Sequence, residues 1–255
     1  MKKGVNYEKL GIMQTFKQTF SFDKKEKGIF DGIVGYDGIK KILNLALIAE
    51  NTIAICLAGP PATGKSRIVK CIEKHYGDHA VWFDCGRKMI TAAGFRDFMY
   101  ANKNMKILIL DELSRMSPYD QEILLNLIME GTITNTKSMA GYRKESFKGL
   151  KIFATSNNPE KLIDPLKSRL DIYYLPPYTL EQFTTIGIQN YEKFEDKETL
   201  LHAINAVWYR MKSKDLRDLD KLMSYAIADK VDLEEIIQTK LEFSRPKPKQ
   251  KELVE

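Results

Sequence analysis

Hydrophobic residues follow two different patterns along the chain. Up to about residue 175, short apolar runs alternate with segments whose apolar residues recur every three or four positions. Beyond that point only the helical spacing continues. Strands that alternate with helices favour a parallel sheet covered by helices on both faces. The pattern therefore predicts an α/β domain followed by a small all-α domain.

Five apolar runs are the predicted strands of this parallel sheet. They span residues 52–59, 80–85, 106–111, 150–156 and 171–175. A helix is predicted ahead of the first strand, over residues 37–48, with Leu45 among its inward-facing side chains. A second helix is predicted directly after Lys65.

Further helices are predicted on both sides of residue 175. One spans residues 117–131, with Ser117 as its N-cap and Pro118 as its first helical residue. The remaining four helical patterns span residues 179–194, 198–212, 215–228 and 232–243. We expect these four helices to pack together as the small all-α domain.

The sequence divides into four predicted parts. A basic N-terminal lead-in covers residues 1–28, and the α/β domain covers residues 29–177. Two consecutive prolines at its end mark the boundary to the helical domain, residues 178–242. A tail rich in Pro and Lys covers residues 243–255, and its composition is typical of a flexible segment.

Composition narrows the class of protein. The chain has 255 residues, of which 44% are hydrophobic, enough for a sizeable core. The sequence contains neither an apolar run long enough for a membrane span nor a secretory signal at its start, so we expect a soluble cytoplasmic protein without a membrane partner. Three cysteines do not make a disulfide framework. The formal net charge of +6 permits an anionic partner without proving one.

A basic segment, residues 131–149, lies between two of the predicted strands. Two short strand-like runs flank a Gly-containing turn, which predicts a β-hairpin. Its charge is mostly positive, with Lys137, Arg143 and Lys144 opposed by Glu145.

The segment from Gly59 to Ser66, Gly-Pro-Pro-Ala-Thr-Gly-Lys-Ser, has the complete phosphate-loop pattern. It follows a predicted strand and opens a predicted helix, which is the setting such a loop requires. Backbone amides of the loop and of the helix N-terminus point at phosphates, and Lys65 neutralises their β/γ charge. The Ser66 hydroxyl is a candidate Mg²⁺ ligand. The predicted nucleotide-binding residues here are Gly59, Pro60, Pro61, Ala62, Thr63, Gly64, Lys65 and Ser66.

Two carboxylates follow the third predicted strand. Asp111 is placed to hold Mg²⁺ together with Ser66, and Glu112 is placed to act as general base on the attacking water. This pair indicates hydrolysis rather than binding alone. The sequence lacks the Asn-Lys-x-Asp motif that reads guanine, which favours ATP over GTP.

With these motifs the chain resembles the AAA+ ATPases over about residues 28–240. The stretch Phe-Asp-Gly-Ile-Val-Gly-Tyr-Asp-Gly-Ile-Lys-Lys is similar to the family's adenine-side box. The resemblance implies that Ile33, Val34 and Gly35 lie against the base. Phe-Ala-Thr-Ser-Asn resembles the sensor 1 strand, which implies that Asn157, with Asn158 as the alternative, positions water between Glu112 and the γ-phosphate.

Two arginines occupy family positions as well. Asp-Pro-Leu-Lys-Ser-Arg-Leu-Asp resembles the arginine-finger segment, so Arg169 is expected to reach the ATP of the next subunit. Lys-Asp-Leu-Arg-Asp-Leu-Asp-Lys-Leu resembles the sensor 2 helix, and Arg217 is expected to reach a γ-phosphate from the helical domain of the same or a neighbouring subunit. The resemblance thus implies a P-loop fold with a helical lid, and catalysis between subunits.

The hairpin resembles one branch of the family, which includes minichromosome maintenance helicases, Holliday-junction branch-migration motors and MoxR-type ATPases. This branch implies a homo-oligomeric ring, expected to be hexameric, that acts on DNA with Lys137, Arg143 and Lys144 facing a phosphate backbone. Specificity is expected to come from a partner protein or from the basic ends of the chain. Two alternatives stay open: a MoxR-type remodeller of proteins, and an ATP-dependent switch such as a replication initiator or clamp-loader subunit.

Overall fold

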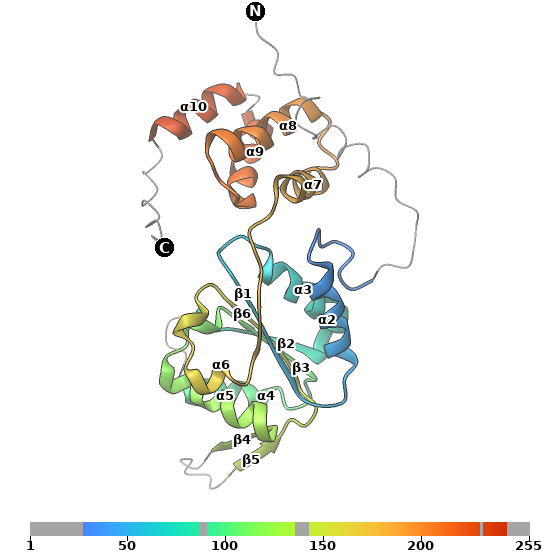
Figure 1. Cartoon of the computed structure of the whole chain (residues 1–255), viewed down its shortest axis with the longest axis vertical. Coiled ribbons are helices and arrows are strands. Elements are labelled where there is room, and N and C mark those ends of the chain that lie inside the picture. The colour runs from blue at the N-terminus through green and yellow to red at the C-terminus, as the bar shows by residue number, and fades with distance from the viewer. Residues whose placement is uncertain (1–27, 87–90, 136–142, 230–231, 244–255) are drawn as a thin grey trace, which may run out of the picture. The chain divides into compact units, whose positions relative to one another are not determined.

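The computed structural model describes residues 28–86, 91–135, 143–229 and 232–243. These residues form two compact units that divide between Pro177 and Tyr178 (Figure 1). The first unit contains a parallel sheet and the second is helical. Within the described residues, no helix combines the length and the apolar composition that crossing a membrane requires.

The sheet has five parallel strands in the order β2-β3-β6-β1-β7. This confirms the predicted α/β class. The strands are β1 (Ile53–Ala58), β2 (Ala80–Asp84), β3 (Ile107–Asp111), β6 (Lys151–Ser156) and β7 (Asp171–Tyr174). Because the strands are parallel, their carboxyl ends share one edge of the sheet. The phosphate loop and the two carboxylates of the predicted site follow β1 and β3 at this edge.

Helices cover both faces of the sheet (Figure 1). Side chains along β1 alternate between them: Ile55 and Leu57 pack on one face and Ala54 and Cys56 on the other. The first face is covered by α2 and α3 and the second by α4, α5 and α6. These helices are α2 (Asp37–Ile48), α3 (Lys65–Tyr76), α4 (Ala92–Ala101), α5 (Pro118–Glu130) and α6 (Asp164–Lys167).

Two details of the helices differ from the predictions. Leu45 of α2 was expected to face inward, but it is 56% exposed because Leu43 and Ala46 occupy the buried stripe. Helix α4 was not predicted. Its signal is nevertheless present, since the Thr91 hydroxyl caps it by accepting from the Gly94 amide, and Phe95 is buried in the core below.

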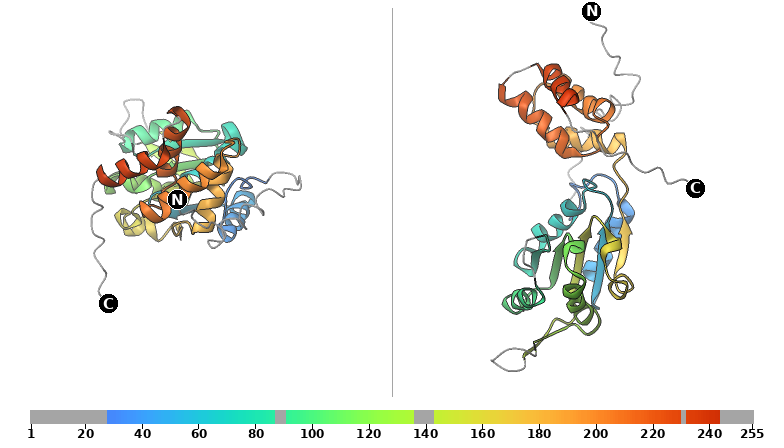
Figure 2. Two further views of the ribbon diagram at one scale, coloured as in Figure 1. Left: turned by 90° about the horizontal axis from the view of Figure 1, so that it is seen from above. Right: turned by 90° about the vertical axis from the view of Figure 1, so that its left-hand side faces the viewer.

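The predicted hairpin is present as an antiparallel pair, β4 (Thr132–Asn135) and β5 (Arg143–Ser146). It begins where α5 ends and finishes just before β6, so it lies at the amino ends of the strands, opposite to the phosphate loop (Figures 1 and 2). Ile133 and Phe147 are buried in the core under α5 and fix the base of the hairpin to this unit.

The second unit is all-α, as predicted. Its helices are α7 (Leu180–Asn190), α8 (Lys197–Asn205), α9 (Leu216–Asp229) and α10 (Leu233–Phe243), and a π-helical turn over Ala206–Arg210 continues α8. Thr179 and Gln182 form a capping box at the start of α7. Gly187 lets the helices pack closely, because a Cβ there would lie 2.9 Å from Ile204 Cδ1 and 3.0 Å from Leu219 Cδ2.

Candidate active site

The phosphate loop adopts backbone conformations that its glycines permit. Gly59 has φ 139°, and a Cβ at this position would collide with the Leu175 carbonyl oxygen. Gly64 has φ 81° directly before α3 begins at Lys65. Ala62, a non-glycine residue, also has a positive φ of 64°. The loop therefore wraps tightly against the end of β7, and the first amides of α3 are presented to an incoming anion.

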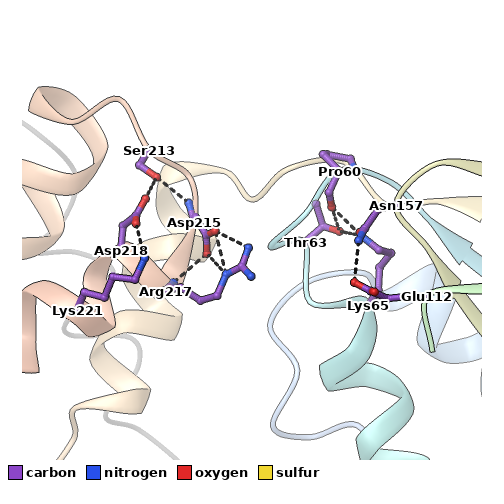
Figure 3. A network of polar contacts seen from close by, with 10 residues as sticks. All are labelled: Pro60, Thr63, Lys65, Glu112, Asn157, Ser213, Asp215, Arg217, Asp218 and Lys221. Carbon is purple, nitrogen blue, oxygen red and sulfur yellow. Dashed lines mark hydrogen bonds and ion pairs between the residues drawn. The ribbon is translucent and has the colours of Figure 1, made fainter. Parts of the chain in front are cut away.

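Lys65 lies inside the curve of this loop. Its ammonium group donates to the carbonyl oxygens of Gly59 at 2.8 Å and Pro60 at 2.6 Å, and to the Thr63 hydroxyl at 3.2 Å (Figure 3). The residue is only 6% exposed. Burial lowers the pKa of this ammonium group to about 8, although the nearby carboxylates of Asp111 and Glu112 oppose the shift. Lys65 is thus positioned by neutral oxygens where a phosphate would supply the missing negative charge.

Asp111, at the end of β3, joins the loop to the central strand β6. Its Oδ1 accepts hydrogen bonds from the Ser66 hydroxyl at 3.0 Å and from the Thr155 hydroxyl at 2.6 Å. Ser66 belongs to the first turn of α3 and Thr155 to β6. The structure therefore brings together the two residues predicted to hold Mg²⁺. Hydroxyl and carboxylate oxygens are ligands that Mg²⁺ prefers, so this pair fits the ion.

Glu112 follows directly and has a left-handed backbone conformation, φ 57° and ψ 43°. Its Oε1 lies 3.5 Å from the Asn157 side-chain amide, and its Oε2 lies 2.6 Å from Arg115 Nε. The Asn157 contact is at the outer limit of a hydrogen bond, yet it places the predicted sensor beside the predicted base (Figure 3). Gly86 lies against the same carboxylate, because a Cβ there would be 2.8 Å from Glu112 Oε2.

The predicted adenine-side residues lie ahead of α2. Ile33 is buried in the core beneath α2 and α3, whereas Val34 and Gly35 are half-buried. Gly35 and Tyr36 both have positive φ, 73° and 59°, so the chain turns sharply before α2 begins. The Tyr36 hydroxyl donates to the Pro176 carbonyl oxygen at 2.8 Å. Val34 and Gly35 are therefore the members of this set with exposed surface for a base.

Each of the two predicted arginines is held within its own turn of chain. Arg169 donates from Nη1 to the Pro165 carbonyl oxygen at 2.6 Å. In the helical unit, Arg217 contacts both oxygens of Asp215, with Nη2 2.7 Å from Oδ2 and Nε 3.0 Å from Oδ1 (Figure 3). The Arg217 side chain is 66% exposed. The described contacts thus leave both guanidinium groups near the surface of their units.

The predicted nucleic-acid residues are described only in part. Lys137 lies outside the described residues, and of Arg143 only the backbone in β5 is described. Lys144 is exposed, and its backbone pairs with Thr134 across the hairpin. Lys144 is therefore the residue of this set that the structure places on the surface.

Sequence reasoning did not single out two residues that contact the predicted base and metal ligand. Thr155 donates to Asp111 and accepts from the Glu112 backbone amide at 3.0 Å, and Arg115 pairs with the Glu112 carboxylate. Thr155 stands two residues before Asn157 on the sensor strand, where an inward-facing hydroxyl could have been expected from strand alternation. Arg115 is three residues from Glu112, a local spacing that is common and carries little signal.

Comparison with known proteins identifies a domain within the chain. Residues 55–178 match the model of the ATPase family associated with various cellular activities, AAA. The chain is 24% identical over 197 residues to a replication factor C small subunit from Staphylothermus marinus, covering 72% of this chain and 55% of that protein. It is 30% identical over 176 residues to a Lon protease from Fusobacterium nucleatum, covering 62% of this chain and 22% of that protein. The chain thus spans about half, or less, of the length of these relatives.

Solved structures show the same fold. A mutant of RuvB from Thermotoga maritima superposes with a TM-score of 0.61 at 18% identity, covering 86% of this chain and 73% of that one. The Thermotoga maritima RuvB Holliday junction branch migration motor superposes with a TM-score of 0.57 at 16% identity, covering 84% and 72%. The family match, with the phosphate loop, shows that the chain carries an AAA ATPase domain, and these structural likenesses, with the sheet order, show that the domain has the AAA+ fold.

Proposed function

We propose that this chain is a Mg²⁺-dependent ATPase that works as a ring of identical subunits on DNA. The observation that carries the proposal is the gathering of Lys65, Asp111 and Glu112 at one edge of the sheet. The basic hairpin at the opposite end of the same unit supports the choice of a nucleic acid. Similarity to proteins named replication factor C and RuvB supports the same choice.

Hydrolysis would use the residues at the strand ends in separate roles. The loop amides and Lys65 bind the phosphates, whose negative charge replaces the carbonyl oxygens that Lys65 contacts now. Asn157 orients a water molecule, and Glu112 removes its proton as it attacks the γ-phosphate. Both are within reach of one another, as this division of labour requires.

Ser66 and Asp111 would hold Mg²⁺, since their oxygens already lie 3.0 Å apart. The ion, when bound, neutralises charge on the β- and γ-phosphate oxygens. The protein's own contribution is to fix the two ligand oxygens in advance, through the first turn of α3 and the end of β3.

Arg169 would complete the site of a neighbouring subunit. Arg169 lies two residues after helix α6, which packs on the sheet face opposite to α3, and its guanidinium makes only short-range hydrogen bonds among the described residues. A guanidinium supplied from outside stabilises the charge that develops in phosphoryl transfer. Arg217 would act on the γ-phosphate from a helical unit. On this basis the active form is a homo-oligomer, which we propose to be hexameric.

Helix α5 offers a mechanical link between the site and the hairpin. It begins shortly after Glu112 and ends at Glu130, two residues before β4 starts at Thr132, and its 13 residues span about 20 Å. Both of its ends are fixed: Ser117 caps the first, and the Gly131 amide donates to the Leu127 carbonyl oxygen at the second. A shift of the strand ends on hydrolysis would therefore carry the hairpin with it.

The test is steady-state ATP hydrolysis across a range of protein concentrations, with and without single-stranded, duplex and forked DNA. We expect turnover per subunit to rise with protein concentration, because each site needs its neighbour, and to rise again with DNA. A preparation that hydrolyses ATP at a rate independent of both would refute the ring and the DNA substrate while leaving the ATPase assignment intact.

Replacing Lys137, Arg143 and Lys144 by Ala tests the hairpin directly. We expect DNA binding to weaken and its dependence on salt to become shallower, with basal hydrolysis unchanged. The matched control replaces the exposed residues Lys41, Lys74 and Lys103, which removes the same charge elsewhere on the unit. Equal losses in both triple variants would show a general charge effect instead of a hairpin contact.

A second candidate substrate is a protein, as for a MoxR-type remodeller. The identity of 30% to a protein named Lon protease favours it. The site residues would be the same, but hydrolysis would respond to an unfolded polypeptide such as casein and ignore DNA. The similarity to a replication factor C subunit also keeps an ATP-dependent switch in view, for which hydrolysis would end after one turnover per assembly.

A further inference from the structure

A buried hydroxyl connects the two acidic residues at the end of β3. Thr155 lies on β6, next to β3 in the sheet, and is 1% exposed. Its Oγ1 is 2.6 Å from Asp111 Oδ1 and 3.0 Å from the Glu112 backbone nitrogen. The direction of both hydrogen bonds is fixed, because an amide N–H can only donate and an ionised carboxylate can only accept. The hydroxyl therefore donates to Asp111 and accepts from Glu112.

The backbone at Glu112 gives this second hydrogen bond its importance. Glu112 has φ 57°, a left-handed conformation that is unfavourable for a residue with a Cβ and persists only when its surroundings fix it. That turn directs the chain out of β3 and into the short helical turn Leu113–Arg115. The Thr155 hydroxyl supplies the Glu112 amide with its partner at this point. It thus holds the backbone that carries the general base.

The first hydrogen bond restrains the other acid. Asp111 Oδ1 is shared by the Thr155 and Ser66 hydroxyls, which approach from β6 and α3. If Ser66 turns toward Mg²⁺, the Thr155 hydrogen bond still keeps the Asp111 carboxylate in its rotamer. A threonine at this position restrains the predicted metal ligand and the predicted base with one atom.

We propose that Thr155 is a positioning residue for ATP hydrolysis. Its hydroxyl fixes the Asp111 carboxylate and the Glu112 backbone relative to each other. The inference rests on the proposed ATPase activity. It predicts that loss of the hydroxyl slows the chemical step and leaves nucleotide binding largely unchanged, because the hydroxyl bonds to Asp111 and to the Glu112 amide and not to the amides of the phosphate loop. A displacement of about 1 Å in a reacting group can lower a rate by about a hundredfold.

The test compares Thr155→Val, which keeps the shape of the side chain, with Thr155→Ser, which keeps the hydroxyl. We expect kcat to fall about 10- to 100-fold in the Val variant, with the Kd for ATP within threefold of the parent. The Ser variant should recover most of the rate. The matched control is Thr184→Val in the helical unit, because the Thr184 hydroxyl is buried without a hydrogen-bond partner among the described residues. We expect its kcat to equal that of the parent.

A Val variant with the parental kcat would overturn the inference, as would a Ser variant as slow as the Val variant. If Thr155→Val fails to fold, Thr155→Cys keeps the volume with a weaker hydrogen-bonding group, and a kcat equal to the parent's would count against the proposal in the same way. A parent protein that hydrolyses no ATP would refute the proposed function itself. These outcomes separate the two claims.

Discussion

The predicted site residues at the carboxyl ends of the strands and the two predicted arginines, Arg169 and Arg217, are held by different kinds of contact. The hydrogen bonds that connect Asp111 and Glu112 with α3 and β6 join residues more than 40 positions apart, as between Ser66 and Asp111 or between Thr155 and Asp111. Arg169 and Arg217 instead contact residues four and two positions away. Long-range contacts in a buried sheet are fixed by the fold, whereas short-range contacts at the surface depend only on the local turn.

This difference indicates which part of the machinery is built in advance. The residues predicted to be metal ligands, base and sensor are held by β3, β6 and α3 within one unit, so they lie together without a second subunit. Among the described residues, the hydrogen bonds of both arginines stay within their own turns of chain, at the surface of their units. Acidic residues that the fold fixes in advance, together with arginines held only by local contacts, suit the proposed enzyme, whose activity would depend on assembly. The following predictions test that contrast.

Arg169→Ala should have the largest effect. We expect kcat to fall about 10³- to 10⁵-fold while ATP binding stays intact, because an arginine finger stabilises charge in the transition state only. Lys167→Ala, two residues earlier in the chain, removes a cation that pairs locally with Asp164 at 2.9 Å, and it should leave kcat within about twofold.

Mixing variants shows whether Arg169 acts across a subunit boundary. Lys65→Ala subunits lack the lysine of the phosphate loop but keep Arg169. Arg169→Ala subunits lack the arginine but keep Lys65. Mixed rings should regain part of the activity that each variant lacks alone. If the mixture stays as inactive as its components although co-assembly is demonstrated by pull-down, Arg169 does not complete a neighbour's site.

Glu112→Gln, which changes a residue at the strand ends, should have the next largest effect. The amide keeps the size of the side chain but cannot take the proton of water, so kcat should fall about 10²- to 10⁴-fold. ATP binding should persist, and the variant should trap the ATP-bound assembly in size-exclusion chromatography. Loss of ATP binding in this variant would mean that Glu112 has a binding role instead.

The same contrast explains what the sequence could reveal. The phosphate loop was predictable because its residues are contiguous and its glycines meet local backbone requirements, such as φ 81° at Gly64. The five strands were predictable from their apolar runs, since the residues alternate between two covered faces. The role of Thr155 depends on the register of β3 against β6, which pairs Leu110 with Ala154, and no local pattern encodes that register.

Other features escaped prediction because they depend on competition between neighbours. The exposure of Leu45 follows from how Leu43 and Ala46 fill the stripe of α2 that the sheet can cover. The pairing of Arg115 with Glu112 follows from the left-handed turn at Glu112, which brings two nearby side chains together. The roles of Asn157, Arg169 and Arg217 remain predictions drawn from family resemblance.

The third prediction concerns the pH dependence of ATP binding, through the buried ammonium group of Lys65 in the phosphate loop. Burial lowers the pKa of Lys65 to about 8, so the nucleotide-free protein loses this charge as the pH rises past that value. Bound phosphates favour the charged form, and binding above pH 8 must therefore take up a proton. The affinity for ATP should fall by up to about tenfold per pH unit above that point.

The measurement is the Kd for ATP at pH 7, 8 and 9, with proton uptake determined by calorimetry in buffers of different ionisation enthalpy. Lys65→Arg is the control, because a guanidinium stays charged throughout this range and the slope should vanish even if affinity is lower. A constant Kd from pH 7 to 9 in the parent would contradict the lowered pKa.

The smallest effect is expected at Asp215, which holds the Arg217 guanidinium with contacts of 2.7 and 3.0 Å. If Arg217 must leave this carboxylate to reach a γ-phosphate, Asp215→Asn should strengthen ATP binding about two- to fivefold, the size expected of an exposed ion pair. Asp220→Asn, which disturbs a hydrogen bond to the Tyr191 hydroxyl instead, should leave the Kd unchanged. Weaker ATP binding in Asp215→Asn would reverse the interpretation: the carboxylate would then orient Arg217 for the nucleotide, and this arginine would be preorganised like the acids at the strand ends.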